Sequence, residues 1–257
     1  MDSAARRWAE LLDGWIIPDE ILFQAPEDPW SIAPAAVAPA LVATDTPSRQ
    51  CALESLPAGG SVLDVGCGAG AASLALVPPA GLVVGLDSAS AMLDAFGAAC
   101  RARGVHYQAV LGEWPAAAAI VDVAHVVVCH HLAYTMRDVV AFAVELTGRA
   151  RHRVVVEMGA VHPSVALAPL WRHFWKLDRP RGPTAGDFLA ALSEAGIEPV
   201  VAQAPGRPHV KSSADDAAVA RRRLCLPVER EPEVAKALSV LPPTSTDVWT
   251  FAWPGDA

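Results

Sequence analysis

The sequence predicts an α/β protein with a doubly wound, mostly parallel sheet and an N-terminal helical cap. Strand-like and helix-like segments alternate from residue 61 to residue 158, which is typical of a sheet covered by helices on both faces. The strand-like segments are continuous apolar runs, as expected for parallel strands that are buried on both sides. The first 50 residues lack this alternation, because prolines interrupt an apolar stretch at Pro26, Pro29, Pro34 and Pro39.

The N-terminal cap, or lid, is predicted over residues 1–50. Apolar residues recur at helical spacing up to about Trp15, which indicates a first amphipathic helix. Pro18 stands where a second helix can begin. Residues 51–257 are predicted to form the main domain. Within that domain, residues 159–183 form an insertion rich in tryptophan and proline, which we expect to contribute to the binding site of a substrate.

The main domain contains seven segments with the composition of strands. They cover residues 61–65, 82–86, 107–111, 123–129, 153–158, 197–202 and 248–253. Helices are predicted between them at residues 71–76, 90–102, 138–150, 184–195 and 213–240, the last in two pieces. Gly196 is expected to end the helix that Thr184 begins.

Composition excludes several classes of protein. Apolar residues make up 53% of the 257 residues and charged residues 19%, so the chain as a whole is not disordered. The net charge of −8 argues against nucleic acid as the main partner. No apolar run reaches the 18 residues of a membrane span, and charges near the N-terminus interrupt any signal-peptide core. Five cysteines without a C-x-x-C pair argue against disulfides and a zinc site, so no metal and a cytoplasmic setting are expected.

A glycine-rich turn follows the first predicted strand of the main domain. Residues 62–70 read V-L-D-V-G-C-G-A-G, so that Gly66 and Gly68 lie between a strand and a helix. Glycine adopts positive φ at little cost and lets a ligand approach the backbone closely. The turn also directs N–H groups of the helix N-terminus at whatever binds there. We therefore expect a cofactor at this turn.

Two cofactor classes fit the turn. The spacing Gly66-x-Gly68-x-x-Ala71 satisfies a dinucleotide fingerprint, and Asp87 follows 21 residues after Gly66, where an NAD enzyme places its ribose acid. Asp64 favours S-adenosylmethionine instead, because a carboxylate would repel a pyrophosphate but attract the methionyl ammonium, by roughly 1.5–3 kcal/mol. An NAD-dependent oxidoreductase stays open as an alternative, as does a non-catalytic cofactor-binding protein of the same fold.

The same residues resemble a known family. Residues 62–70 are similar to motif I of the class I S-adenosylmethionine-dependent methyltransferases, and Asp87 resembles their ribose-binding acid. Residues 112–114 resemble the segment after the third strand, where an acid meets the adenine amine. Residues 122–132 resemble the fourth strand and the turn behind it. The resemblance implies a Rossmann-like sheet of seven strands whose last strand is antiparallel, for which residues 248–253 are the candidate.

This resemblance implies S-adenosylmethionine as the cofactor and defines the residues expected around it. They are Asp64, Gly66, Cys67, Gly68, Asp87, Ser88, Met92, Gly112, Glu113, Trp114 and Cys129. Met92 and Trp114 would pack on the adenine, or they would be ordinary core residues. Cys67 and Cys129 are interpreted as small apolar residues that flank the site.

The acceptor side is less well defined by the sequence. His130 and His131 follow the fourth strand and are the candidate bases, although they could serve only to orient the substrate. The residues expected to contact the substrate are Trp30, Tyr134, His162 and Trp171. The tryptophans could instead bury the cap against the sheet. The predicted function is methyl transfer to an O, N or C nucleophile of a small molecule, by a monomer or homodimer.

Overall fold

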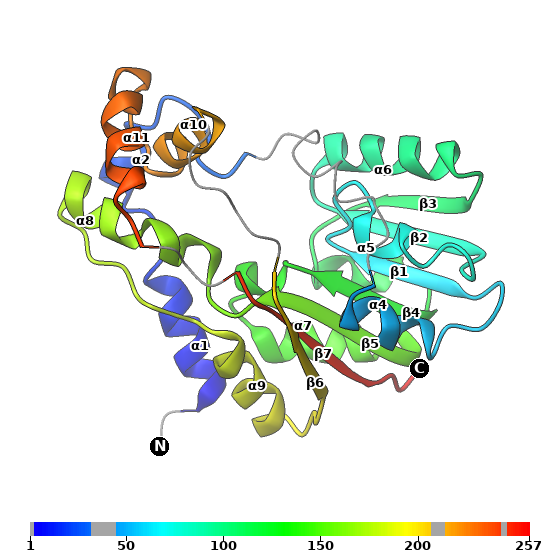
Figure 1. Ribbon diagram of the computed structural model, residues 1–257. Coiled ribbons are helices and arrows are strands. Elements are labelled where there is room, and N and C mark those ends of the chain that lie inside the picture. Colours follow the sequence, from blue (N-terminus) through cyan, green and yellow to red (C-terminus); the bar gives the residue numbers. More distant parts are fainter. Residues whose placement is uncertain (1–2, 32–44, 207–213, 243–245) are drawn as a thin grey trace.

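The computed structural model describes residues 3–31, 45–206, 214–242 and 246–257. One seven-stranded sheet has the order β3-β2-β1-β4-β5-β7-β6 (Figure 1). Its strands are β1 (Ser61–Val65), β2 (Leu82–Asp87), β3 (His106–Leu111), β4 (Ala124–His130), β5 (Ala150–Gly159), β6 (Val200–Ala204) and β7 (Val248–Pro254). Strands β1 to β5 pair in parallel, whereas β7 runs antiparallel to both β5 and β6. The predicted fold class and its antiparallel last strand are confirmed.

The helices lie between the strands along the chain, as the alternation predicted. Their bounds are α1 (Ala4–Asp13), α2 (Asp19–Leu22), α4 (Pro47–Leu53), α5 (Ala71–Leu74), α6 (Ser90–Ala102), α7 (Val139–Thr147), α8 (Ala168–Trp175), α9 (Ala185–Glu194), α10 (Ala214–Arg223) and α11 (Glu231–Ser239). Helix α9 begins at Thr184, whose side chain forms a capping box with Asp187. Short 3₁₀ turns within the described ranges are Ala116–Ile120, Ala133–Thr135, Pro163–Leu167 and Val228–Arg230.

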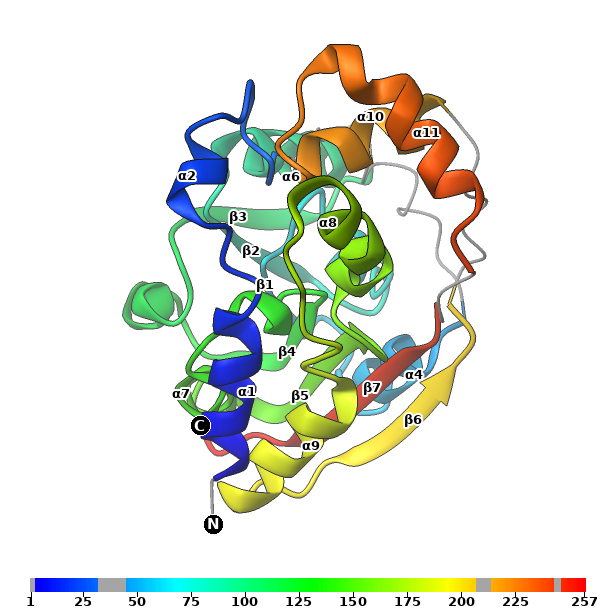
Figure 2. The ribbon, with the colours of Figure 1, turned by 90° about the vertical axis from the view of Figure 1, so that its left-hand side faces the viewer.

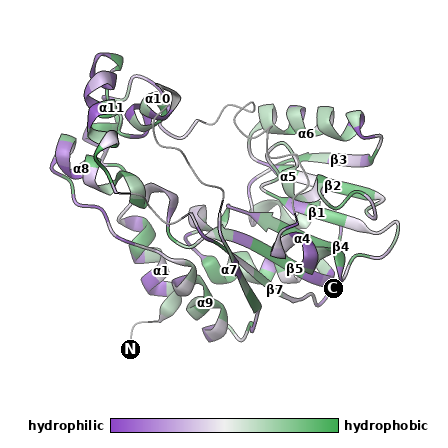
Figure 3. Cartoon of the chain, in the orientation of Figure 1, coloured by the Kyte–Doolittle hydropathy of each residue, from purple (hydrophilic) through white to green (hydrophobic). Residues whose placement is uncertain are grey.

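The sheet separates two apolar layers because successive side chains of a strand point to opposite faces. Val62 belongs to the layer under α4, α5 and α6, whereas its neighbour Leu63 belongs to the layer under α1, α7 and α9. Both side chains are fully buried. Figure 3 shows the central strands coloured largely as hydrophobic, which agrees with strands covered on both faces.

Helix α1 packs on the flank of the sheet rather than in a separate cap. It contacts α9 and α7, and its Trp8 is completely buried. The indole N–H of Trp8 donates to the backbone carbonyl of Met136 at 2.8 Å, in the loop after β4. The strongly amphipathic pattern of residues 4–13 is explained by this contact with the main domain.

A helical unit with its own small core, which we call the cap, lies at one end of the molecule (Figures 1 and 2). It consists of α2, α8, α10 and α11, so three distant segments of the chain contribute to it. Its buried residues include Ile21, Leu170, Trp171, Leu224 and Val234. The cap expected at residues 1–50 thus contributes α2 to this unit, while residues 32–44 lie outside the described residues.

No helix in the described ranges is long and apolar enough to cross a membrane. The positive mean hydropathy of the sequence comes instead from the buried strands. All five cysteines are free thiols, and four of them are buried.

Candidate cofactor and acceptor site

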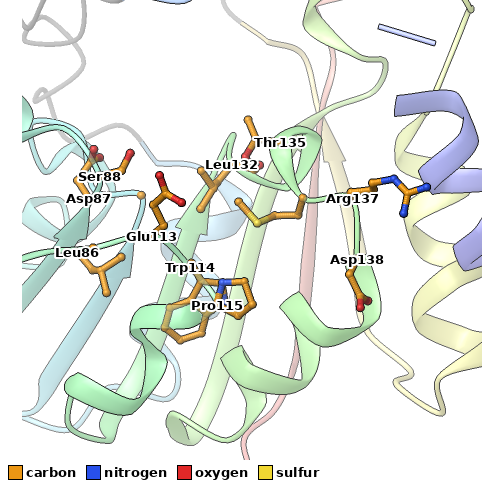
Figure 4. Close-up of a pocket in the computed structure, with 13 residues that line it drawn as sticks. Leu86, Asp87, Ser88, Glu113, Trp114, Pro115, Leu132, Thr135, Arg137 and Asp138 are labelled. Carbon is orange, nitrogen blue, oxygen red and sulfur yellow. Dashed lines mark hydrogen bonds between the residues drawn. The ribbon is translucent and has the colours of Figure 1, made fainter. Parts of the chain in front are cut away.

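A cleft of about 540 Å³ opens at the carboxyl edge of the sheet (Figure 4). Ligands of open α/β sheets bind at this edge, and the volume suits a cofactor-sized molecule. The lining residues come from the ends of β1 and β2, the loop after β3 and the loop after β4. They are Gly66, Leu86, Asp87, Ser88, Gly112, Glu113, Trp114, Pro115, Leu132, Thr135, Met136, Arg137 and Asp138.

The glycine turn forms one wall of the cleft with a backbone that only glycine adopts easily. Gly66 has φ +71°, and a Cβ there would lie 3.0 Å from the Leu132 side chain. Gly68 has φ +51°, and a Cβ there would meet no atom of the described residues within 4 Å. The N–H groups of Gly66 and Cys67 both donate to the carbonyl of Leu86, at 2.8 and 3.0 Å.

The acids Asp87 and Glu113 supply negative charge to this cleft. Asp87 stands at the end of β2, where its Oδ2 accepts the Gly68 N–H at 2.9 Å and its Oδ1 accepts the Ala89 N–H at 2.9 Å. The backbone N–H of Gly112 donates to the Asp87 carbonyl at 3.0 Å and ties the next loop to the same place. Figure 4 shows Asp87, Ser88 and Glu113 projecting into one region of the cleft.

Asp64 lies beneath the glycine turn and is only 1% exposed. Its carboxylate points toward α5, on the same side of the sheet as Val62. The Oδ2 atom accepts the Ser73 hydroxyl at 2.6 Å and the Ser73 N–H at 3.2 Å. Burial raises the pKa of Asp64 to about 6, despite these hydrogen bonds. In this arrangement Asp64 fixes the turn and α5, and it does not belong to the described lining of the cleft.

The remaining residues expected near the cofactor divide into two groups. Trp114 lines the cleft, is 5% exposed and directs its indole N–H at the Phe142 carbonyl, 3.4 Å away. Met92, Cys67 and Cys129 are buried and are not among the described residues that line the cleft. Cys67 packs against the residues around Phe96, which agrees with its interpretation as an apolar packing residue.

The two candidate bases meet a carboxylate that the sequence analysis did not single out. His130 Nδ1 lies 3.7 Å and His131 Nε2 lies 3.5 Å from Oε1 of Glu157 on β5. Oε2 of Glu157 accepts the hydroxyl of Ser48 on α4 at 2.5 Å. Burial would raise the pKa of Glu157, but the His131 hydrogen bond, the His130 charge and the Ser48 hydroxyl outweigh it and lower the pKa to about 2.

His130 and His131 differ in their surroundings. The side chain of His130 is 23% exposed, and burial lowers its pKa, so its imidazole is neutral at pH 7. The side chain of His131 is 60% exposed. Its backbone has φ +60°, a conformation that residues other than glycine rarely adopt, and its N–H donates to the Glu157 carbonyl at 2.7 Å.

An aromatic cluster brings two of the expected substrate contacts together. Tyr134 stacks on Trp8 with ring centroids 5.6 Å apart, and its hydroxyl donates to the Gly159 carbonyl at 2.7 Å. His162 stacks on Trp15 at 4.7 Å and lies edge-on to Tyr134 at 5.3 Å. Burial lowers the pKa of His162 to about 4, so its ring is neutral at pH 7.

The other two expected substrate contacts lie in or next to the cap. Trp171 is buried in the core of the cap, and the Arg179 guanidinium lies over its ring at 4.2 Å. The same guanidinium is 5.9 Å from the Trp15 ring, which connects Trp171 to the aromatic cluster. Trp30 is 46% exposed and is covered on one side by Arg223 at 5.1 Å.

Sequence reasoning missed Glu157, Ser48 and the loop residues Leu132 and Thr135–Asp138. Glu157 did carry a signal, because it is the one acid in its strand and directly follows three valines. Ser48 carried none. Arg137 closes one end of the cleft through a two-point ion pair with Asp13 of α1, with N–O distances of 2.8 and 2.9 Å.

Among the described residues, no group of three or more His, Cys, Asp or Glu side chains is arranged to hold a metal ion. The described lining of the cleft includes Gly66, Asp87 and Glu113, but it does not include His130, His131, Glu157, Tyr134 or His162.

Comparisons with known proteins agree with this geometry. Residues 62–149 match the family model described as a methyltransferase domain. No curated protein matches the sequence. Among solved structures, BH2331 of Bacillus halodurans, a proposed methyltransferase, is 15% identical with a TM-score of 0.54, covering 82% of this chain and 99% of its own. The YcgJ protein of Bacillus subtilis is 15% identical with a TM-score of 0.52, covering 82% and 98%.

A third similar structure is magnesium protoporphyrin IX methyltransferase (ChlM) of Synechocystis with bound SAH. It is 14% identical with a TM-score of 0.51, and the match covers 87% of this chain and 83% of that one. At these identities the likeness shows the fold, and the fold is that of methyltransferases.

Proposed function

We propose that the chain transfers a methyl group from S-adenosylmethionine to a small-molecule acceptor, since residues 62–149 match the family model described as a methyltransferase domain. The observation that carries this proposal is the pairing of two acids, Asp87 and Glu113, in one cleft beside a glycine turn. S-adenosylmethionine supplies an already activated methyl group on a sulfonium. The protein must therefore mainly hold the two reactants in line and exclude water.

The residues of the cleft fit this cofactor. Each Asp87 oxygen already accepts one backbone N–H and has a lone pair left for a ribose hydroxyl. Glu113 is placed to accept the adenine amine, with Trp114 packed below it. No described residue lies within 4 Å of a Cβ on Gly68, which among these residues leaves room for the cofactor to pass close to the backbone. SAH bound in the structurally similar ChlM lends further support.

The hydrogen bonds of the turn disfavour the dinucleotide alternative. A phosphate-binding turn needs free N–H groups directed at the ligand. Here the N–H groups of Gly66 and Cys67 are bonded to Leu86, and that of Gly68 is bonded to Asp87. A pyrophosphate at this place would meet the Asp87 carboxylate instead of donors. Asp64 separates S-adenosylmethionine from a dinucleotide less clearly than its position in the sequence suggested. The reason is that its carboxylate points toward Ser73.

The acceptor would lie beyond the cleft, near the ends of β4 and β5. His130 and His131 are the candidate bases there, and Tyr134 with His162 would form an aromatic wall. Since His130 and His162 are neutral at pH 7, neither adds positive charge against the sulfonium. Asp64 would act on the methionine end of the cofactor through the turn that it holds in place.

The setting is proposed to be cytoplasmic, with no nucleic-acid partner and a monomeric or homodimeric state. Support comes from the net charge of −8 and from five cysteines that are all free thiols.

The experiment that tests this function compares the two cofactor classes on the same sample. Addition of S-adenosylhomocysteine at 100 times its dissociation constant should stabilise the folded protein by about 2.7 kcal/mol. NADH should change neither the melting temperature nor its own fluorescence on mixing. A nicotinamide fluorescence change that saturates, with no stabilisation by S-adenosylhomocysteine, would instead establish the oxidoreductase alternative.

A further inference from the structure

The cluster of Ser48, Glu157, His130 and His131 lies at the carboxyl ends of β4 and β5. His130 and Glu157 are direct neighbours in the parallel register of these two strands. Both have the side-chain direction of Val128 and Val155, which face the layer under α4. This shared direction explains why Ser48 of α4 reaches the carboxylate.

Glu157 is held at three points. Its Oε2 accepts the Ser48 hydroxyl at 2.5 Å, its Oε1 faces both imidazoles within 3.7 Å, and its carbonyl accepts the His131 N–H at 2.7 Å. The carboxylate is only 12% exposed, so water cannot replace these partners easily. One carboxylate therefore faces both imidazole rings.

The backbone of His131 is left-handed, with φ +60°. Its N–H donates to the backbone carbonyl of residue 157 at 2.7 Å, which joins the turn after β4 to β5. Left-handed residues other than glycine concentrate at functional sites.

We propose that Glu157 is the positioning residue of a two-histidine proton acceptor, and that the methyl acceptor is accordingly a hydroxyl or amine that loses a proton during transfer. This inference rests on the proposed methyltransferase function and narrows it to acceptors that must give up a proton during transfer. The arrangement follows the general pattern in which a third group orients the base of an activated nucleophile.

The step balances without a further reactant. The acceptor oxygen or nitrogen forms a bond to the methyl carbon with its lone pair, and the methyl–sulfur bond breaks with its electron pair remaining on sulfur. The acceptor proton passes to the free nitrogen of a histidine whose other nitrogen faces Glu157, and then to water. The ionised Glu157 stabilises the imidazolium formed in this step.

Four groups face this site from the elements packed around it. Glu157 comes from β5, His131 from the turn after β4, and Ser48 from α4, while Thr250 of β7 is the register neighbour of Glu157. Burial lowers the pKa of His130 most strongly, the Glu157 charge raises it, and the His131 charge lowers it. Removing the Glu157 charge must therefore make His130 harder to protonate.

The test uses Glu157→Gln, with Glu198→Gln on the surface as a matched control and with Ser48→Ala as a second variant. The first readout needs neither cofactor nor acceptor. Titration of His130 by NMR should show its pKa fall by about one unit in Glu157→Gln, rise slightly in Ser48→Ala, and stay unchanged in Glu198→Gln. If Glu157→Gln does not fold, Ser48→Ala decides with the opposite sign, because without the Ser48 hydroxyl the Glu157 charge acts on His130 unshared; a fall of the His130 pKa in Ser48→Ala would overturn the inference.

The second readout is turnover. In Glu157→Gln the acid limb of the pH–rate profile should move to lower pH and kcat should fall at least tenfold, with S-adenosylhomocysteine affinity within threefold of the wild type. An unchanged pKa of His130 in folded Glu157→Gln overturns the inference. A tenfold loss of cofactor affinity without a fall of the His130 pKa also overturns it, because Glu157 would then be a cofactor ligand. Absence of S-adenosylhomocysteine binding to the wild type would sink the proposed function while the histidine titration still reports on Glu157.

Discussion

The carboxylate of the single residue Asp87 both accepts backbone hydrogen bonds and lines the cleft. It organises the glycine turn through the Gly68 N–H and the next helix through the Ala89 N–H, and it faces the cleft. We expect Asp87→Ala to weaken S-adenosylhomocysteine binding at least tenfold, or by about 1.4 kcal/mol. Calorimetric titration checks this, with the exposed Asp94→Ala on α6 as the control. Equal affinity in a folded Asp87→Ala would mean that the ribose lies elsewhere.

Asp64 makes a different prediction because it is buried. Its pKa is about 6 in the folded protein and near 3.9 in an unfolded chain, so the fold favours the protonated form. The resulting stabilisation is complete below about pH 3.9 and is lost as the pH rises through about 6. An asparagine at this position does not titrate, so it adds no pH dependence to the free energy of unfolding.

The stability of Asp64→Asn relative to the wild type should therefore increase between pH 4 and pH 7, by about 2 to 3 kcal/mol. Urea unfolding at several pH values measures it, and Asp122→Asn on the surface should follow the wild type. If the free energies of unfolding of Asp64→Asn and of the wild type change in parallel with pH, burial does not raise the pKa of Asp64.

At the scale of elements, the contact of β2 with α6 is unusually close. A Cβ on Gly85 would lie 2.7 Å from two ring atoms of Phe96 and 2.9 Å from the Cys67 sulfur. Gly85→Ala should therefore cost about 1 to 3 kcal/mol of unfolding free energy. Denaturant unfolding tests this against Gly148→Ala, where the nearest atom lies 3.7 Å away. A neutral Gly85→Ala would show that α6 can shift without loss.

The strands were predictable because their apolar runs bury both faces, and the observed bounds differ from the predicted ones by at most three residues at either end. The direction of individual side chains was not predictable to the same degree. Asp64 belonged to the right motif, but strand alternation turns its carboxylate toward Ser73 rather than into the cleft. Glu157 meets His130 only because β4 and β5 pair in one particular register, which the sequence does not specify.

The assembly of the cap was also not predictable from the sequence. Its helices were recognisable from local patterns, but α2, α8 and α11 are far apart in the chain. Only burial of a shared core joins them. No local sequence pattern predicts which of these distant helices pack together.

For the whole molecule, the structure has one core on each face of the sheet and a third inside the cap. Leu224 is fully buried in the third core. We expect Leu224→Ala to cost about 2 to 5 kcal/mol of cap stability. Hydrogen exchange should then accelerate in α8, α10 and α11 while the amides of β1 and β4 stay protected. Equal loss of protection throughout would show that the cap and the sheet unfold as one unit.

The proposed function depends on binding of S-adenosylmethionine in the cleft beside the glycine turn. Isothermal titration of the wild-type protein with S-adenosylhomocysteine measures this binding without an acceptor. We expect saturable binding at one site per chain, which Asp87→Ala weakens at least tenfold. If folded wild-type protein gives no heat of binding up to millimolar ligand, the cleft does not bind this cofactor.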